Sequence, residues 1–203
     1  MCFKKELSNR HILDVFYYQD VLCDACRDKF EIKRKVVDLK TFKVESFYVY
    51  NEAFKQAILQ YKECCDEALA PLFIYPIYWY LKLRYYGFTF VVIPSSKQAI
   101  EKRGFHHVAQ MLEVAGFKTL SIFEKNEDLK QSSMPKNRRN EIEEHIVLKK
   151  NCEVPDKVLL VDDILTTGST MKICHLLIKN KAKTLKAVTF SYNSAWNNEK
   201  QGV

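Results

Sequence analysis

The side chains best suited to ligand chemistry are found around two adjacent acidic residues, Asp162 and Asp163. These acids are expected to end a strand formed by an apolar run, Val158–Val161, which is typical of a strand buried on both faces. A loop rich in hydroxyl groups follows, Thr166–Thr170, and then an amphipathic helix expected from about Met171 to Asn180. Ligands of α/β proteins bind at the carboxyl ends of strands, beside helix N-termini. We therefore expect a ligand site at this point.

The loop and the acids suit different parts of one ligand. Gly168 lets the backbone turn tightly, so that the following amides can face a phosphate beside the helix N-terminus. Further donors to such a phosphate are the hydroxyls of Thr166, Thr167, Ser169 and Thr170. The acids would repel a phosphate, but they can accept hydrogen bonds from sugar hydroxyls or hold Mg²⁺. A ligand with a phosphate at one end and a diol at the other, such as a ribose 5-phosphate, satisfies both halves.

Three simpler interpretations account for less of this segment. An ordinary capped helix needs one hydroxyl, whereas the loop has four. A Walker-B strand requires a glycine-rich P-loop with Gly-Lys-Ser or Gly-Lys-Thr, and none of the five glycines has that context. A receiver-type acid pair is expected on the first strand of its domain, but this pair lies close to the end of the sequence. The nucleotide-type interpretation accounts for most of the segment.

Three segments resemble a known family. Val158–Thr170 resembles the phosphoribosyl pyrophosphate (PRPP) motif of type I phosphoribosyltransferases. Val91–Lys97 and Lys102–His107 resemble the ComF branch, the competence-associated phosphoribosyltransferase-like proteins, whose usual Arg-Gly-Phe-Asn-Gln is replaced here by Arg-Gly-Phe-His-His. Gln131–Asn140 is similar to that family's Gln-rich, Arg-containing mobile loop. Together these resemblances span roughly residues 44–192.

The resemblance implies a role for each matching residue. Asp162 and Asp163 would be the catalytic acids, which bind the ribose 2- and 3-hydroxyls of PRPP with Mg²⁺ bridging these hydroxyls and the pyrophosphate. Thr166, Thr167, Gly168, Ser169 and Thr170 would hold the 5-phosphate. The pyrophosphate loop would consist of Ser95, Ser96 and Lys97. Without the motif, Lys97 would be interpreted as an ordinary exposed loop lysine.

Other polar residues beside these motifs have less defined roles. Guanidinium groups match phosphate oxygens, so Arg103, Arg138 and Arg139 are candidates for further phosphate ligands. His106 and His107 either contact a nucleophile or only cap a helix, and we favour the helix cap.

Strand and helix patterns alternate along the chain. The expected strands are Thr41–Tyr50, Thr89–Ile93, Thr119–Phe123, Lys157–Val161 and Thr184–Ser191. The expected helices are Glu52–Ala70, Leu72–Tyr86, Ala99–Ala115 and Thr170–Asn180. This alternation predicts an α/β fold, a mainly parallel sheet with helices on both faces, as in type I phosphoribosyltransferases. The polar stretch Glu124–Lys150 is expected to be a lid-like hairpin outside the core.

Residues 1–36 are expected to form a small appendage to a phosphoribosyltransferase-like domain at 37–203. Cys23 and Cys26 have the two-residue spacing of half a zinc site, and Cys2 and His11 are further candidate ligands. ComF-type proteins often carry a four-cysteine zinc finger here, so the resemblance implies a truncated or degenerate finger that could bind Zn²⁺. Seven cysteines without a recognisable secretory signal predict a reducing compartment, the cytoplasm.

The net charge of +7 is compatible with an anionic ligand or with nucleic acid. Two basic groups are candidates for nucleic-acid contacts: Lys33, Arg34 and Lys35 in the appendage, and Arg138 and Arg139 in the polar stretch. The most apolar window, Ala68–Leu81, is shorter than the roughly 20 residues of a membrane-spanning helix, so no membrane span is expected.

Two functions are therefore considered. The ComF resemblance implies a competence protein that binds PRPP and Mg²⁺, handles single-stranded DNA during uptake in natural transformation, and has other competence proteins as partners. The alternative is an active phosphoribosyltransferase, which would transfer phosphoribose from PRPP to a base or another nitrogen acceptor and release pyrophosphate. We place the competence role first. The sequence identifies no acceptor and leaves turnover open.

Overall fold

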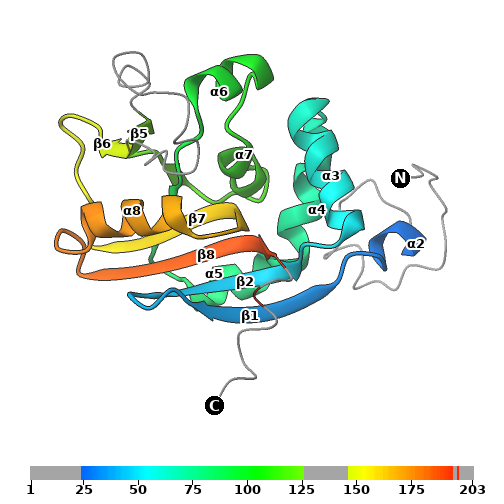
Figure 1. Ribbon diagram of the computed structural model, residues 1–203, viewed down its shortest axis with the longest axis horizontal. Helices are drawn as coiled ribbons and strands as arrows, with labels where there is room; N and C mark the ends of the chain where they lie inside the picture. The colour runs from blue at the N-terminus through cyan, green and yellow to red at the C-terminus, as the bar shows by residue number, and fades with distance from the viewer. Residues whose placement is uncertain (1–23, 126–145, 194–195, 197–203) are drawn as a thin grey trace, which may run out of the picture.

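A six-stranded sheet forms the centre of the computed structural model, which describes residues 24–125, 146–193 and 196 (Figure 1). Its strands, in spatial order, are β1 (Ile32–Asp38), β2 (Lys43–Val49), β8 (Thr184–Tyr192), β7 (Lys157–Leu165), β3 (Thr89–Val92) and β4 (Thr119–Leu120). Only the β1–β2 pair is antiparallel within this sheet. A separate antiparallel pair joins β5 (Phe123–Lys125) to β6 (Ile146–Leu148). The predicted mainly parallel sheet is confirmed.

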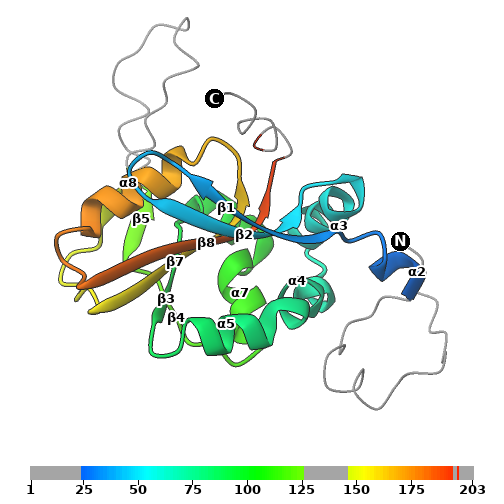
Figure 2. The same ribbon diagram turned by 90° about the horizontal axis from the view of Figure 1, so that it is seen from below.

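Helices cover both faces of the sheet, as predicted. One face carries α3 (Glu52–Glu63), α4 (Ala70–Ile74), α5 (Tyr78–Arg84) and α7 (His107–Glu113), and the other carries α8 (Ser169–Ile178). Figure 2 shows α8 on one side and α4, α5 and α7 on the other. The other helices of the described residues are α2 (Asp24–Arg27) and α6 (Lys97–Arg103), with 3-10 turns at Glu67–Leu69 and Tyr75–Ile77. None of the helices described is long and apolar enough to cross a bilayer.

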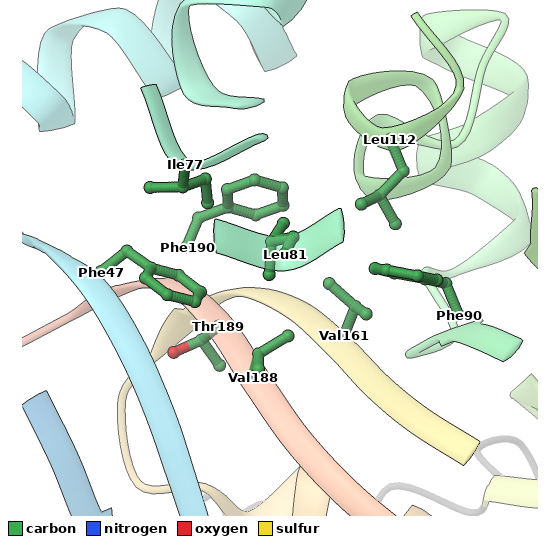
Figure 3. Close-up of a pocket in the computed structure, with 9 residues that line it drawn as sticks. All are labelled: Phe47, Ile77, Leu81, Phe90, Leu112, Val161, Val188, Thr189 and Phe190. Carbon is green, nitrogen blue, oxygen red and sulfur yellow. The ribbon is translucent and has the colours of Figure 1, made fainter. Parts of the chain in front are cut away.

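The strand β7 separates two apolar cores, because its side chains alternate between the faces. Leu159 and Val161 belong to the core beneath α3, α4, α5 and α7, whereas Val158 and Leu160 belong to the core beneath α8. Figure 3 shows part of the first core, where Leu81 of α5 lies over the sheet. Truncating such a buried leucine to alanine costs about 2–5 kcal/mol. This packing on both faces holds the carboxyl end of β7 in place.

Local backbone signals divide the long helices that the apolar pattern predicts. The expected helix Glu52–Ala70 ends at Glu63, and Cys65 follows with a φ of 55°. Pro76 lies in the 3-10 turn between α4 and α5. Gly104, with a φ of 86°, ends α6, and its N–H donates to Ile100 at 2.7 Å. Proline and left-handed residues thus convert three expected helices into shorter ones.

Two expected strands differ from those observed. The strand expected to stop before the acids continues to Leu165, because β7 pairs with β8 through Asp162 opposite Thr189 and Leu165 opposite Tyr192. The strand expected at Thr119–Phe123 is divided between β4 and β5. The acids therefore lie inside a strand and have defined directions.

The expected domain boundary after residue 36 falls inside β1. Residues 32–36 belong to the central sheet, because β1 pairs with β2 from Ile32 to Asp38. Cys26 is buried in the larger core together with Phe30. The other predicted zinc ligands, Cys2, His11 and Cys23, lie outside the described residues, so the zinc site stays a prediction. The same holds for most of the predicted hairpin, residues 126–145.

Candidate functional site

The acid pair lies near the carboxyl end of β7, and its two side chains have different surroundings. Asp163 faces α3 and α7, where it contacts Lys62 and His107. Asp162 instead lines a pocket with the segment from Ile164 to Met171. One oxygen of each acid and one ring nitrogen of His107 still lie within 4.8 Å of one another. The pair is therefore a single polar centre with two environments.

Asp163 is held within the protein by three contacts. Its Oδ1 accepts from the backbone N–H of Ile164 at 2.8 Å, and its Oδ2 accepts from the Lys62 ammonium. His107 Nε2 lies 3.3 Å from the same Oδ2, although it is not aligned for a hydrogen bond. Burial would raise the pKa of Asp163, but the charge of Lys62 and the contact of His107 outweigh it and hold this pKa well below its usual range. Asp163 is thus ionised and paired.

Asp162 has the opposite electrostatic character. Its Oδ1 accepts from the backbone N–H of Asp163 at 2.9 Å. Burial, together with the negative charge of Asp163, raises the pKa of Asp162 well above its usual range. In the part of the chain that the structure describes, Asp162 has no cationic partner of the kind that Lys62 gives Asp163, so a bound cation or a diol would relieve this cost. It is the acid of the pair that is available to a ligand.

The contacts of His107 define its tautomer. Arg103 NH1 lies 3.0 Å from His107 Nδ1, and a guanidinium can only donate, so Nδ1 is the acceptor. The ring proton is then on Nε2, which faces Asp163. Burial lowers the pKa of His107, which keeps the ring neutral. In this tautomer neither ring nitrogen offers a free lone pair to a metal, so the oxygens of the acid pair are the better cation ligands.

The predicted phosphate loop and Asp162 line the same pocket. Gly168 has a φ of 72° and precedes α8 as its N-cap. A Cβ at this position would lie 2.8 Å from Leu39 Cδ1, so the close packing requires glycine. Thr167 and Ser169 are exposed, and their hydroxyls lie 2.9 Å apart. The structure thus brings Thr166–Thr170 together with Asp162, as the sequence predicts for a phosphate and a diol.

The second predicted loop follows the neighbouring strand. β3 pairs with β7, and Ile93 donates to Val161 O at 3.0 Å, so both loops lie at one edge of the sheet. Ser95 Oγ is 3.3 Å from His107 Nδ1, which brings this serine to the acid pair. Ser96 instead caps α6 by accepting from Ala99 N–H at 3.2 Å. Lys97 is exposed in the first turn of that helix.

Arg103 contacts two residues that lie against Asp163. Its Nε donates to Lys62 O at 3.2 Å, and its NH1 donates to His107. The guanidinium thereby orients two residues that contact Asp163. Its predicted role as a phosphate ligand stays a prediction.

Sequence reasoning missed Lys62 and underestimated His107. Lys62 is in the last turn of α3, where no motif marks it. The helix-cap interpretation holds for His106, whose Nδ1 accepts from Ala109 N–H at 3.3 Å. It does not describe His107, which is buried against the acid pair. The departure from Arg-Gly-Phe-Asn-Gln was the only signal that marked this residue.

The candidate nucleic-acid residues of β1 are partly engaged within the protein. Arg34 donates to the Tyr80 hydroxyl at 2.6 Å and pairs with Glu45 at 3.2 Å. Lys35 donates to the backbone oxygen of Trp196. Lys33 is exposed on the same strand, and Arg138 and Arg139 lie outside the described residues. A DNA contact by these residues stays a prediction.

Three comparisons relate this chain to known proteins. The sequence pattern of the phosphoribosyl transferase domain family matches residues 99–202, which include the acid pair and the loop. Competence protein ComFC from Streptococcus pneumoniae is 37% identical over 147 residues, which cover 72% of this chain and 66% of that protein. A mutant hypoxanthine phosphoribosyltransferase from Trypanosoma cruzi, solved in a ternary substrates complex, is 14% identical. It has a TM-score of 0.37, with 68% of this chain and 78% of that chain covered.

The sheet, its helices and the family match define a phosphoribosyltransferase-like α/β protein. The chain belongs to the phosphoribosyl transferase domain family and, within it, to the ComF proteins. The predicted membership of this family is thereby confirmed. The match spans slightly less than two-thirds of the Streptococcus pneumoniae protein's length.

Proposed function

We propose that this protein binds PRPP with Mg²⁺ at the end of β7 and acts in the handling of single-stranded DNA during natural transformation. The observation that carries the ligand is the shared pocket, in which Asp162 and the loop Thr166–Thr170 meet. A ribose 5-phosphate has a diol and a phosphate at opposite ends, so it matches both sets of groups. The family match supports the same ligand class.

Each element of the site has a task in this proposal. The loop before α8 donates to the 5-phosphate, and the dipole of the ten-residue helix favours that anion. Asp162 accepts from the ribose hydroxyls. Asp163, already paired with Lys62, fixes the end of the strand and supplies the second acidic group. Ser95, beside His107, lies on the side where the pyrophosphate would extend.

The chemistry of the acid pair fits Mg²⁺. This ion prefers oxygen ligands and is commonly held by one or two carboxylates together with phosphate groups of a substrate. Asp162 and Asp163 offer such oxygens within 4.8 Å of each other, and the half-buried Asp162 has no cationic partner of its own among the described residues. When bound, Mg²⁺ would supply positive charge to the pyrophosphate of PRPP.

The DNA-handling role is supported by similarity and charge. The relative from Streptococcus pneumoniae is named a competence protein, and this chain carries a net charge of +7. Positive charge favours binding to phosphate backbones in a manner that depends on salt. Other competence proteins are the expected partners of this role.

Phosphoribosyl transfer is the second candidate function. The ends of β3 and β7 are neighbours, so the loop of Ser95–Lys97 and the loop of Thr166–Thr170 can face the two ends of one PRPP molecule. A transferase must stabilise the departing pyrophosphate more than it must supply a nucleophile. Pyrophosphate release from PRPP across a panel of nitrogen acceptors tests this function. If none of the acceptors in the panel leads to pyrophosphate release, this function is contradicted.

Calorimetric titration with PRPP, with and without Mg²⁺, tests the proposed ligand. We expect saturable binding that requires Mg²⁺ and is lost in Asp162→Asn. Asp156→Asn is the matched control, because Asp156 is an exposed acid paired with Lys183 away from this pocket. Absence of binding by the unmodified protein would overturn the proposed ligand, and equal binding by both variants would overturn the role of Asp162.

A further inference from the structure

A second, larger cavity lies at the amino ends of the parallel strands, away from the acid pair. It is lined by the amino end of β3, whereas the acids are near the carboxyl end of the parallel strand β7. The cavity has a volume of about 460 Å³ and is lined by Tyr78, Lys82, Tyr85, Tyr86, Gly87, Phe88, Thr89, Phe90, Ala115, Gly116, Phe117 and Lys118. Figure 2 shows α5 beside β3 and β4, on the face away from α8. The proposed PRPP site does not use this region.

Aromatic rings form the walls and mouth of this cavity. The rings of Tyr78 and Phe117 lie 5.4 Å apart, and Phe117 lies 4.8 Å from Phe90 behind it. Tyr86 at the mouth is 85% exposed, and Trp79, the next residue after Tyr78, is 44% exposed. An aromatic side chain this exposed contributes little to folding. These rings therefore offer flat apolar faces to a ligand.

Positive charges accompany the rings. The Lys82 ammonium lies 5.0 Å from the centroid of Tyr78 and 5.2 Å from that of Trp79. On the other side, Lys186 of β8 lies 5.2 Å from the centroid of Phe88. The residues that line the cavity include Lys82 and Lys118 but no acid. Cations on ring faces beside an open cavity favour an anionic ligand that also has aromatic groups.

Two glycines leave the mouth of the cavity open. Gly87 and Gly116 both have a positive φ, 75° and 78°, and a Cβ added to either would meet no atom within 4 Å. The backbone is therefore bare at these two turns, which lets another chain approach closely.

We propose that this aromatic surface, formed by Tyr78, Trp79, Lys82, Tyr86, Phe117 and Lys118, binds single-stranded DNA. Bases stack on Tyr86 and Trp79, and a base enters the cavity beside Tyr78 and Phe117. Backbone phosphates lie against Lys82 and Lys118. Proteins that bind single strands combine stacking rings with positive charge in this way. The inference rests on the proposed DNA-handling function and gives that function a surface separate from the PRPP site.

The charge and the exposed rings favour a single strand over the alternatives. In a duplex the bases are already stacked, so their faces are not available to Tyr86. A protein segment would fit the apolar walls, but the acid-free lining with two lysines specifically complements phosphate. The other basic group, on β1, is less suited, because the charge of Arg34 is already paired with Glu45. Lys82 instead contacts neutral groups, the rings of Tyr78 and Trp79 and the Tyr78 hydroxyl.

Fluorescence anisotropy with a labelled oligo-dT and the full chain tests the surface. Tyr86→Ala should weaken binding about tenfold, which corresponds to the loss of one stacked base. Tyr86→Phe keeps the ring and should bind like the unmodified protein. Lys82→Glu/Lys118→Glu should weaken binding further and reduce the slope of log affinity against log salt by about 1.4, since each phosphate contact to a single strand contributes about 0.7.

A matched control separates local contacts from net charge. The control variant Lys55→Glu/Lys149→Glu changes the net charge by the same amount as Lys82→Glu/Lys118→Glu. Both control lysines are exposed: Lys55 is in α3, and Lys149 directly follows β6. We expect the control variant to retain most of the affinity. A duplex of the same length should bind more weakly than the single strand.

Each other outcome has a distinct meaning. If the unmodified protein binds oligo-dT and the Tyr86 and Lys82/Lys118 variants bind as well as the control, this surface is not the site, although the DNA-handling function stands. If Tyr86→Phe loses as much affinity as Tyr86→Ala, base stacking is excluded. If the unmodified protein does not bind oligo-dT, both the surface and the DNA-handling function fail, whatever the result with PRPP.

Discussion

The ammonium of Lys62 donates to the carboxylate of Asp163, across a sequence separation of 101 residues. This contact connects the last turn of α3 to the end of β7. It also distinguishes Asp163 from Asp162, which the sequence alone does not. Asp163 is neutralised within the protein, whereas Asp162 lines the pocket of the proposed ligand. A ligand-binding role is therefore best tested at Asp162 and a structural role at the Lys62–Asp163 pair.

Removing Lys62 should destabilise the protein strongly. The side chains of Lys62 and Asp163 are 21% and 10% exposed, so Lys62→Met leaves a buried negative charge without its partner. The expected loss is about 3–5 kcal/mol in the free energy of unfolding, measured by urea titration. Lys55→Met, in the same helix but exposed, should change stability by less than about 0.5 kcal/mol. Equal stability of the two variants would contradict a structural role for the ion pair.

Replacing Gly168 by alanine should cost more than the same change at Gly116. Both glycines are left-handed, with φ values of 72° and 78°, so both variants carry the same backbone strain. Only at Gly168 would the new Cβ meet a neighbour, Leu39 Cδ1 at 2.8 Å. Overpacking of a core typically costs about 1–3 kcal/mol, which is the expected difference between the variants in urea unfolding. In a Leu39→Ala background this difference should shrink. If it does not, the close approach is not its cause.

Stability should fall in acid because His106 is a half-buried, neutral ring in the folded protein. Its Nδ1 accepts from Ala109 N–H, and its Nε2 donates to Ile93 O at 3.1 Å. Burial and the neighbouring His107 lower the pKa of His106 from 6.5 to about 4. The unfolded chain therefore takes up a proton at a higher pH than the folded chain. The contribution of His106 to stability is present above pH 6.5 and is lost as the pH falls toward 4, by about 3 kcal/mol.

His106→Asn isolates this contribution. Asparagine is a good N-cap and does not titrate, so α7 should stay capped while part of the acid sensitivity disappears. The measurement is urea unfolding at pH 7 and pH 4.5 for both proteins. An unchanged pH dependence in the variant would show that His106 does not titrate as described.

The fold was predictable from local patterns, but the partners of the acid pair were not. The strand and the phosphate loop can be predicted from Val158–Val161 and Asp162–Thr170, because both features depend on residues that are neighbours in the sequence. Lys62 carries no such signal, because it meets Asp163 only after α3 packs on β7. The end of β7 was also misplaced, since pairing with β8 extends the strand to Leu165.

The N-terminal part shows a second limit of sequence patterns. The basic run Lys33–Lys35 favours an appendage when only composition is considered, because charge dominates it. An edge strand with one face on the core needs few apolar residues, and β1 obtains them from Val37, together with Leu39 just beyond its end. Arg34 forms an ion pair with Glu45 within the fold. Composition could not reveal this pairing.

Removing Mg²⁺ should abolish stabilisation by PRPP. A ligand present at 100 times its dissociation constant stabilises the folded protein by about 2.7 kcal/mol, which raises the thermal midpoint by several degrees. We expect this rise with PRPP and Mg²⁺ but not with PRPP and EDTA, because the acids would repel the pyrophosphate unless a cation lies between them. Ribose 5-phosphate is the control for this reason. It lacks the pyrophosphate, so any rise that it produces should depend less on Mg²⁺. If PRPP stabilises the protein equally in EDTA, the acid pair does not act through a cation, and the ligand is held by the loop Thr166–Thr170 alone.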